Sequence, residues 1–220
     1  MTVLVALQEL GDVPAGDDWL TPREKQDLAR LRLPKRRADW RLGRWTGKRA
    51  LESFGGRAPW EVRAAADGAP EVFVEGKPAP LVMSLSHTSG WAVCAVGPAG
   101  VRLGVDLEVL EPRSQEFVAD FFSGDEQDCL GETWDATTLV NLFWSAKESA
   151  LKALRTGLRE DTRGVRVVQW EDTRLAVYVM ERGETLRGVW RTFQGLVLTL
   201  LVAPSEGLDV RWVGCSWTLR

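Results

Sequence analysis

The chain has 220 residues, of which 45% are hydrophobic and 27% are charged, and its formal net charge is −3. This is the composition of an ordinary globular protein, and the length allows one domain or two small ones with a substantial core. The slightly acidic balance argues against general binding of nucleic acid, so any site for an anion must be local.

The cysteines and the first residues bear on the compartment. Cys94, Cys129 and Cys215 are widely spaced and odd in number, which favours buried thiols in a reducing compartment over disulfide bonds or a metal site. Residues 1–10 lack the basic start of a signal peptide, and no apolar run is long enough to cross a bilayer. We therefore expect a cytoplasmic protein that does not act in a membrane.

The first hundred residues predict strands at both ends and two helices between them. Residues 2–7 form an apolar, β-favouring run, and the segment from Thr21 to Glu24 has the composition of a capping box that begins a helix. A longer helix is expected from about Lys35 to Phe54. A loop containing Asp67-Gly68 and Gly76-Lys77-Pro78 then leads to a hairpin of strands 81–86 and 91–96.

The remainder of the chain predicts one strand, three helices and then mostly strands. An apolar strand is expected over residues 101–108, followed by helices near 115–122, after Ser123, and from about 137 to 154. Five β-favouring runs follow, at residues 165–170, 175–180, 186–193, 196–202 and 210–218. This order indicates an α+β protein.

Charged side chains stand out in two of these elements. Because strand side chains alternate, Asp106 and Glu108 leave the same face of their strand. Glu148 and Lys152 are i, i+4 neighbours on the long helix. Separately, each pattern is also common on solvated surfaces. Together, three carboxylates would form the oxygen-rich cluster that suits Mg²⁺, with a lysine able to meet phosphate oxygens.

The segment Gly104-Val105-Asp106-Leu107-Glu108, followed by the segment from Trp144 to Lys152, resembles the signature pair of the 4′-phosphopantetheinyl transferases of the long, surfactin type. Residues 84–88 resemble the Ser-His motif of that family, and residues 121–126 resemble its Phe-Phe-Ser segment. The resemblance implies two similar α+β halves related by a pseudo-twofold, which we expect at residues 1–103 and 104–220. It also implies an active site between them in a monomer.

The activity implied by the resemblance is transfer of the 4′-phosphopantetheine arm of coenzyme A to a serine of an acyl or peptidyl carrier protein. This reaction releases 3′,5′-adenosine diphosphate and depends on Mg²⁺, with Mn²⁺ as a possible substitute. The resemblance suggests secondary metabolism, but the sequence leaves fatty-acid, polyketide and peptide carriers open.

The resemblance also assigns roles to residues of the second half. Asp106, Glu108 and Glu148 are the expected metal ligands. Glu148 is also the expected general base, acting directly or through water, and Lys152 the expected diphosphate contact. Lys147, which points elsewhere around the helix, either stabilises the structure or meets the carrier protein.

Coenzyme A is expected to contact the first half. Ser86 and His87 match the family residues that bind its phosphates, and the basic run between residues 35 and 49 matches the region that holds the 3′-phosphate, for which we choose Arg41. The lysine of a Gly-Lys-Pro motif found in many relatives would fall at Ala69 and be lost, or be supplied by Lys77. Glu126 either lines the metal region or belongs to a capping box after Ser123.

Two functions of other classes remain as alternatives. A metal-dependent phosphodiesterase or nuclease could use the same carboxylates, although the acidic balance and the joint spacing of the motifs disfavour it. A non-catalytic module could bind coenzyme A or a carrier protein. The intact set of three carboxylates argues against it, because a protein that only binds need not keep mutually repelling charges together.

Overall fold

The computed structural model describes residues 1–131 and 135–213, which form two compact units. Unit 1 contains residues 1–101 together with residues 207–213, and unit 2 contains residues 102–131 and 135–206. The chain therefore leaves unit 1 once and returns to it. Cys215 and the predicted strand beyond Val213 lie outside the described residues.

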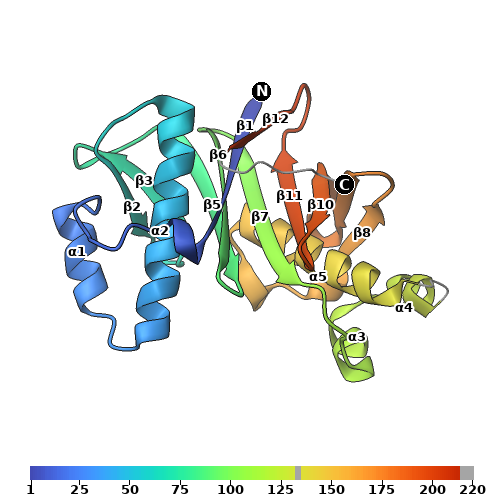
Figure 1. The fold of residues 1–220 in the computed structure, drawn as a ribbon. Helices are drawn as coiled ribbons and strands as arrows, with labels where there is room; N and C mark the ends of the chain where they lie inside the picture. The colour runs from blue at the N-terminus through green and yellow to red at the C-terminus, as the bar shows by residue number, and fades with distance from the viewer. Residues whose placement is uncertain (132–134, 214–220) are drawn as a thin grey trace. The chain divides into compact units, whose positions relative to one another are not determined.

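Unit 1 is built on a sheet with the strand order β12-β1-β6-β5 (Figure 1). Strand β12 pairs with β1 in parallel, whereas the other neighbours are antiparallel. Its elements are β1 (Thr2–Glu9), α1 (Pro22–Ala29), α2 (Pro34–Gly55), β2 (Trp60–Ala64), β3 (Pro70–Val74), β4 (Lys77–Pro78), β5 (Leu81–Thr88), β6 (Trp91–Pro98) and β12 (Asp209–Val213), with a 3₁₀ turn at Leu10–Asp12. Helix α2 packs against β1 and β6.

The predicted helices and hairpin of unit 1 are confirmed, but the predicted loop is wrong over much of its length. Strands β2, β3 and β4 form a small antiparallel sheet there. The runs Trp60–Val62 and Val72–Val74 contain the β-branched and aromatic residues that favour strands, and they flank the Asp67-Gly68 turn. The sheet was missed because each run is short; burial of Trp60, Val62 and Val72 stabilises it in the folded unit.

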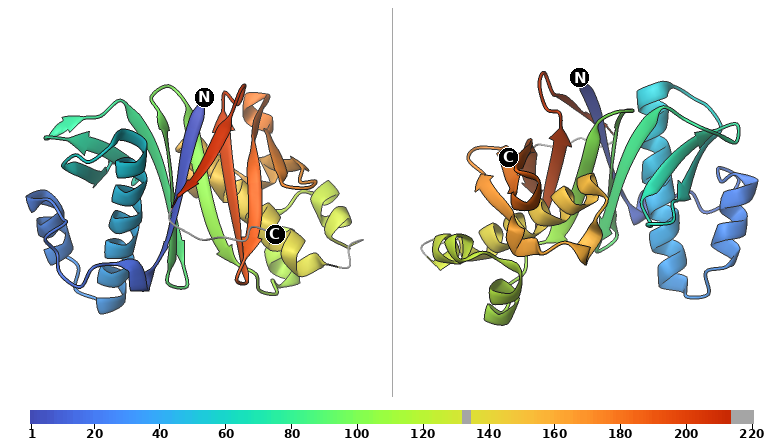
Figure 2. Two further views of the ribbon diagram at one scale, coloured as in Figure 1. Left: turned by 45° about the horizontal axis from the view of Figure 1, so that its top comes forward. Right: turned by 180° about the vertical axis from the view of Figure 1, so that it is seen from behind.

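Unit 2 has one antiparallel sheet with the order β7-β11-β10-β9-β8. Helix α5 lies across one face of this sheet, over β7 and β11 (Figure 2). Its elements are β7 (Arg102–Val109), α3 (Gln115–Phe121), α4 (Gly124–Gly131), α5 (Ala136–Leu154), β8 (Val165–Gln169), β9 (Arg174–Val179), β10 (Glu184–Phe193) and β11 (Leu196–Ala203), with 3₁₀ turns at 157–159, 162–164 and 180–182. These elements match the predictions to within a few residues.

The two units repeat one topology. In each, a first strand is followed by two consecutive helices that pack together (α1 and α2, or α4 and α5), a hairpin (β2–β3 or β8–β9) and a second hairpin whose last strand pairs with the first. The orders β1-β6-β5 and β7-β11-β10 are the same, and β3 lies against β5 as β9 pairs with β10. The predicted α+β fold of two similar halves is therefore confirmed.

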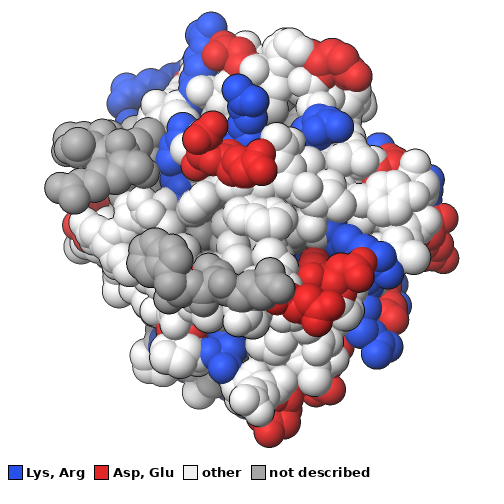
Figure 3. All heavy atoms as spheres, turned by 90° about the vertical axis from the view of Figure 1, so that its right-hand side faces the viewer, with Lys and Arg blue, Asp and Glu red and all other residues white. Residues whose placement is uncertain are grey.

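The surface carries charges of both signs. On the face drawn in Figure 3, basic and acidic side chains are interspersed without a large field of either sign. No helix within the described residues combines the length and the apolar character needed to span a bilayer.

Candidate active site

Helix α5 and strand β7 approach each other unusually closely. A Cβ atom added at Gly104 would lie 1.8 Å from the backbone oxygen of Ser149, so only glycine fits at this position of β7. On the neighbouring strand, the Thr199 hydroxyl lies 2.9 Å from Ser145 Oγ and 2.8 Å from Ser149 Oγ. These buried contacts fix α5 on the face of the sheet from which Asp106 and Glu108 project.

Asp106 is the most buried carboxylate of the predicted cluster, with 3% of its surface exposed. Lys152 Nζ lies 2.6 Å from Asp106 Oδ1 and donates a weaker hydrogen bond to the Val105 carbonyl at 3.3 Å. The sequence predicted that Lys152 and Glu148 are neighbours on the helix. The structure adds that the short ion pair of Lys152 joins the helix to the strand.

Glu108 is held through both of its carboxylate oxygens. Trp144 Nε1 donates to Oε1 at 3.2 Å, and an Arg113 guanidinium nitrogen donates to Oε2 at 3.0 Å. Arg113 is itself held by Asn141 Oδ1 at 2.8 Å. Burial raises the pKa of the Glu108 carboxyl and the charge of Asp106 raises it further, while Arg113 and Trp144 act in the opposite direction.

Glu148 lies on α5, half-buried, within electrostatic reach of the other two carboxylates. Burial raises the pKa of its carboxyl, as do the charges of Asp106 and Glu108, against the lowering effect of Lys152. The charges of Asp106 and Glu108 therefore act on Glu148, and the three carboxylates together are a set of oxygen donors. Such a set fits a hard divalent cation such as Mg²⁺ or Mn²⁺.

The three carboxylates are not arranged as a finished metal site. Within residues 1–131 and 135–213, no group of three or more His, Cys, Asp or Glu side chains has the arrangement needed to hold a metal ion. The charges of Asp106 and Glu108 are balanced instead by Lys152 and Arg113. The three carboxylates therefore fit a cation by the chemistry of their oxygen atoms, but not by their arrangement in this structure.

Lys147 has a structural role, which decides between the two alternatives left by the sequence. Its side chain is fully buried, which excludes contact with a carrier protein. Nζ donates to Glu126 Oε2 at 2.8 Å and to the carbonyls of Thr162 and Val165 at 2.9 and 2.6 Å. Glu126 also completes a capping box with Ser123.

Apart from Lys152, the residues predicted to bind coenzyme A lie in unit 1. Ser86 and His87 are consecutive residues of β5, so their side chains leave opposite faces of the strand; Ser86 is half-buried and His87 is exposed. Lys77 is exposed in the short strand β4, whereas Ala69 lies in the turn between β2 and β3.

Arg41 is engaged with the segment that precedes α1. Its Nε lies 2.9 Å from Asp17 Oδ1, and Nη2 donates to the carbonyls of residues 14–16. Several neighbours in the basic run also have partners: Arg37 donates to the Leu28 carbonyl, and Lys48 is buried against Glu24. Lys35 and Arg36, at the start of α2, are exposed.

Three residues of the site escaped the sequence analysis. Trp144 and Arg113 donate hydrogen bonds to Glu108, and Gly104 allows α5 to approach β7 closely. Gly104 and Trp144 lie in the quoted motifs, but the sequence analysis gave them no role. The glycine was a recognisable signal, because a glycine inside a strand often marks a close backbone approach. No signal in the sequence identified Arg113 and Trp144 as partners of Glu108, because they are 5 and 36 residues away in the chain.

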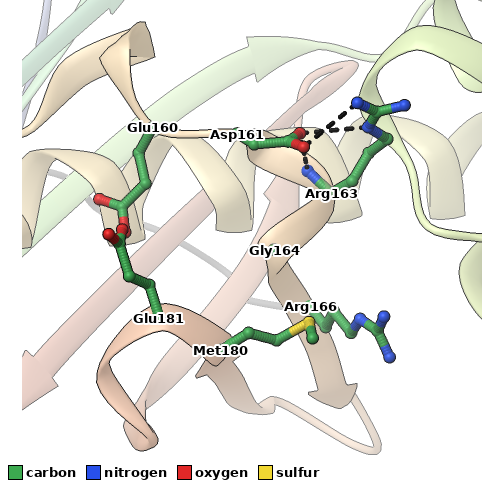
Figure 4. Close-up of a pocket in the computed structure, with 7 residues that line it drawn as sticks. All are labelled: Glu160, Asp161, Arg163, Gly164, Arg166, Met180 and Glu181. Carbon is green, nitrogen blue, oxygen red and sulfur yellow. Dashed lines mark hydrogen bonds and ion pairs between the residues drawn. The ribbon is translucent and has the colours of Figure 1, made fainter.

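A pocket of about 420 Å³ in unit 2 lies apart from these residues. Its lining includes Glu160 and Glu181, whose carboxylates point toward each other, and Asp161, which is paired with Arg163 at 3.2 Å (Figure 4). None of the predicted site residues lines it.

Known proteins show only weak likeness to this chain. No curated protein matches the chain. The solved structures it resembles include holo-[acyl-carrier-protein] synthase from Thermotoga maritima, with 16% identity, coverage of 46% of this chain and 61% of that chain, and a TM-score of 0.34. For the Helicobacter pylori enzyme in complex with coenzyme A, the identity is 13%, the match covers 44% of this chain and 99% of that chain, and the TM-score is 0.31.

The family models are more informative than these weak structural likenesses. The model of the 4′-phosphopantetheinyl transferase N-terminal domain matches residues 24–97, which lie in unit 1. The model of the 4′-phosphopantetheinyl transferase superfamily matches residues 102–201, which include the carboxylates and Lys152. The two matches follow each other in the expected order and cover most of the chain. The chain belongs to the 4′-phosphopantetheinyl transferase superfamily.

Proposed function

We propose that this protein transfers the 4′-phosphopantetheine arm of coenzyme A to a serine of an acyl or peptidyl carrier protein and releases 3′,5′-adenosine diphosphate. The observation that carries the proposal is the cluster of Asp106, Glu108 and Glu148 beside Lys152, in a chain of this superfamily. The presence of two units in one chain supports the surfactin type acting as a monomer, which light scattering would test.

The metal ligands in this proposal are Asp106, Glu108 and Glu148. A Mg²⁺ or Mn²⁺ ion held there would supply positive charge for the diphosphate and stabilise the leaving group. Lys152 would contribute a further positive charge to the diphosphate oxygens. Glu148 would accept the proton of the attacking serine, directly or through a water molecule.

Apart from Lys152, the proposed contacts with coenzyme A lie in the first half of the chain, at residues 1–103. Ser86 would donate its hydroxyl to a phosphate oxygen, and His87 would contribute a second contact. Residues 104–220 would carry the metal ligands and the catalytic helix.

We expect the Arg41→Ala substitution to weaken binding of coenzyme A more than that of dephospho-coenzyme A, which lacks the 3′-phosphate. The reason is the loss of a charge-assisted hydrogen bond to that phosphate. Calorimetric titration of both ligands measures the difference. Equal losses would place the 3′-phosphate elsewhere and leave Arg41 as the anchor of residues 14–17 alone.

The proposed function is tested by the intact mass of apo carrier proteins after incubation with this protein, coenzyme A and Mg²⁺. Carriers of fatty-acid, polyketide and peptide synthesis are used in parallel. A mass increase of one phosphopantetheine arm, abolished by a chelator, is expected for at least one of them. Cleavage of coenzyme A without any carrier would indicate a phosphodiesterase. Binding without turnover on any carrier would indicate a non-catalytic module.

A further inference from the structure

The two units repeat short sequence segments at equivalent places in their topology. Val5-Ala6-Leu7-Gln8 in β1 corresponds to Val105-Asp106-Leu107-Glu108 in β7. Trp45-Thr46-Gly47-Lys48 in α2 corresponds to Trp144-Ser145-Ala146-Lys147 in α5. Thr21 and Glu24 form the capping box of α1, as Ser123 and Glu126 do at the start of α4.

The first repeated contact joins the long helix of each unit to its first strand. Trp45 Nε1 donates to Gln8 Oε1 at 3.1 Å in unit 1. Trp144 Nε1 donates to Glu108 Oε1 at 3.2 Å in unit 2. In both units, the indole therefore holds the side chain of the equivalent strand residue, which is Gln8 in unit 1 and Glu108 in unit 2.

The second repeated contact is a buried pair of lysine and glutamate. Lys48 Nζ lies 2.7 Å from Glu24 Oε2 and donates to the Trp60 carbonyl at 2.7 Å, while the other oxygen of Glu24 accepts from Val62 N at 3.0 Å. Unit 2 contains the same set. Lys147 contacts Glu126 Oε2 and the Val165 carbonyl, and Glu126 Oε1 accepts from Val167 N at 2.9 Å.

The charged groups of the proposed site are not repeated. Ala6 and Gln8 stand in unit 1 where unit 2 has Asp106 and Glu108. Counting along the helices from the tryptophans, Arg49 corresponds to Glu148 and Ser53 to Lys152. Every charge that the proposed function uses in unit 2 is thus lost or reversed in unit 1, while the tryptophan contact and the Lys–Glu pair are kept.

The two units share one scaffold, and unit 1 lacks the charges of the site. We infer that Trp144 is a positioning residue that orients Glu108. This inference rests on the proposed function. The contact of tryptophan with the strand is present in unit 1, which lacks the charges of the site, and so it does not depend on substrate. It orients the strand side chain, and in unit 2 that side chain is a proposed metal ligand. Hydrogen bonds to such ligands affect metal affinity because they fix the orientation of the carboxylate.

The repeat supplies a matched pair of variants, Trp144→Phe and Trp45→Phe. Each keeps a packed aromatic ring and removes one indole donor. We expect both to shift the thermal midpoint by similar amounts. Only Trp144→Phe should weaken Mn²⁺ binding, by about 10-fold, and lower the transfer rate to a similar extent. Mn²⁺ binding is measured from the EPR signal of the free ion, with and without coenzyme A.

A third variant, Glu108→Gln, gives unit 2 the tryptophan–glutamine pair found in unit 1. We expect it to fold with a thermal midpoint close to that of the wild type and to lose Mn²⁺ binding by more than 10-fold. Even if Trp144→Phe does not fold, this variant tests whether Glu108, the residue that Trp144 contacts, is a metal ligand.

The outcomes separate this inference from the proposed function. Wild-type protein that binds no Mn²⁺ would overturn the metal assignment of the proposed function. If the wild-type protein binds Mn²⁺ and the two tryptophan variants weaken that binding equally, or neither weakens it, the positioning role of Trp144 is overturned. A Glu108→Gln variant that folds and keeps wild-type Mn²⁺ binding would overturn the role of Glu108 as the ligand that Trp144 orients.

Discussion

Replacement of Glu148 by glutamine is expected to lower the rate of phosphopantetheine transfer by about 1,000-fold while the protein stays folded. The substitution preserves the shape of the side chain and removes one of three carboxylate charges. It also removes the group proposed to accept the serine proton. Both losses act on the reaction and neither creates a cavity.

The stability of the Glu148→Gln variant follows from the sign of its pKa shift. Burial and the charges of Asp106 and Glu108 raise the pKa of Glu148 in the folded protein. A carboxyl whose folded pKa is raised has an ionised form that is less favourable in the folded state than in the unfolded one. Removing that charge should therefore leave the thermal midpoint at neutral pH unchanged or slightly higher.

The measurement combines transfer kinetics with thermal denaturation. Glu181→Gln is the matched control, because this exposed carboxylate belongs to the same unit but lies in the pocket of Figure 4, apart from the cluster. We expect the control to transfer at the wild-type rate. Near-normal turnover by Glu148→Gln would show that neither the metal nor the serine proton depends on this residue.

The Gly104→Ala substitution is expected to destabilise unit 2 by about 3 kcal/mol or more. The added methyl group would lie 1.8 Å from Ser149 O and 2.8 Å from Ala153 N, which are backbone atoms of α5 and cannot rotate away. The helix would have to move off β7. That movement would break the contacts of Ser145 and Ser149 with Thr199 and separate Lys152 from Asp106.

Urea denaturation of Gly104→Ala tests this expectation. Gly124→Ala is the control: it lies at the start of α4, and a Cβ atom there would meet nothing within 4 Å. We expect this variant to be as stable as the wild type or more stable, because alanine favours the helix. Wild-type stability of Gly104→Ala would show that α5 does not need its close contact with β7.

Local patterns in the sequence predicted the elements and the composition of the site. The capping boxes at Thr21 and Ser123 located two helix starts because their interactions span only three residues. Strand alternation placed Asp106 and Glu108 on one face for the same reason. Resemblance to a family then connected these residues with Glu148 and Lys152.

Long-range contacts were beyond local patterns. Asp106 forms an ion pair with Lys152, which is 46 residues away, and their spacing in the sequence does not predict this pair. The burial of Lys147 could not be predicted either, because its three partners come from two other segments of the chain. The engagement of Arg41 with Asp17 depends in the same way on how a loop folds back against α2.

The return of the chain to unit 1 has a consequence for synthesis on the ribosome. Strand β1 pairs with β6 on one side and with β12 on the other, and Asp209 N donates to the Met1 carbonyl at 2.8 Å. Residues 102–206 must be translated after β6 and before β12, which takes roughly 5–20 s at the usual rates of synthesis. During that time, one edge of β1 in the nascent chain is open to pairing with other strands. Unit 2, which is continuous, can complete its sheet before unit 1 does.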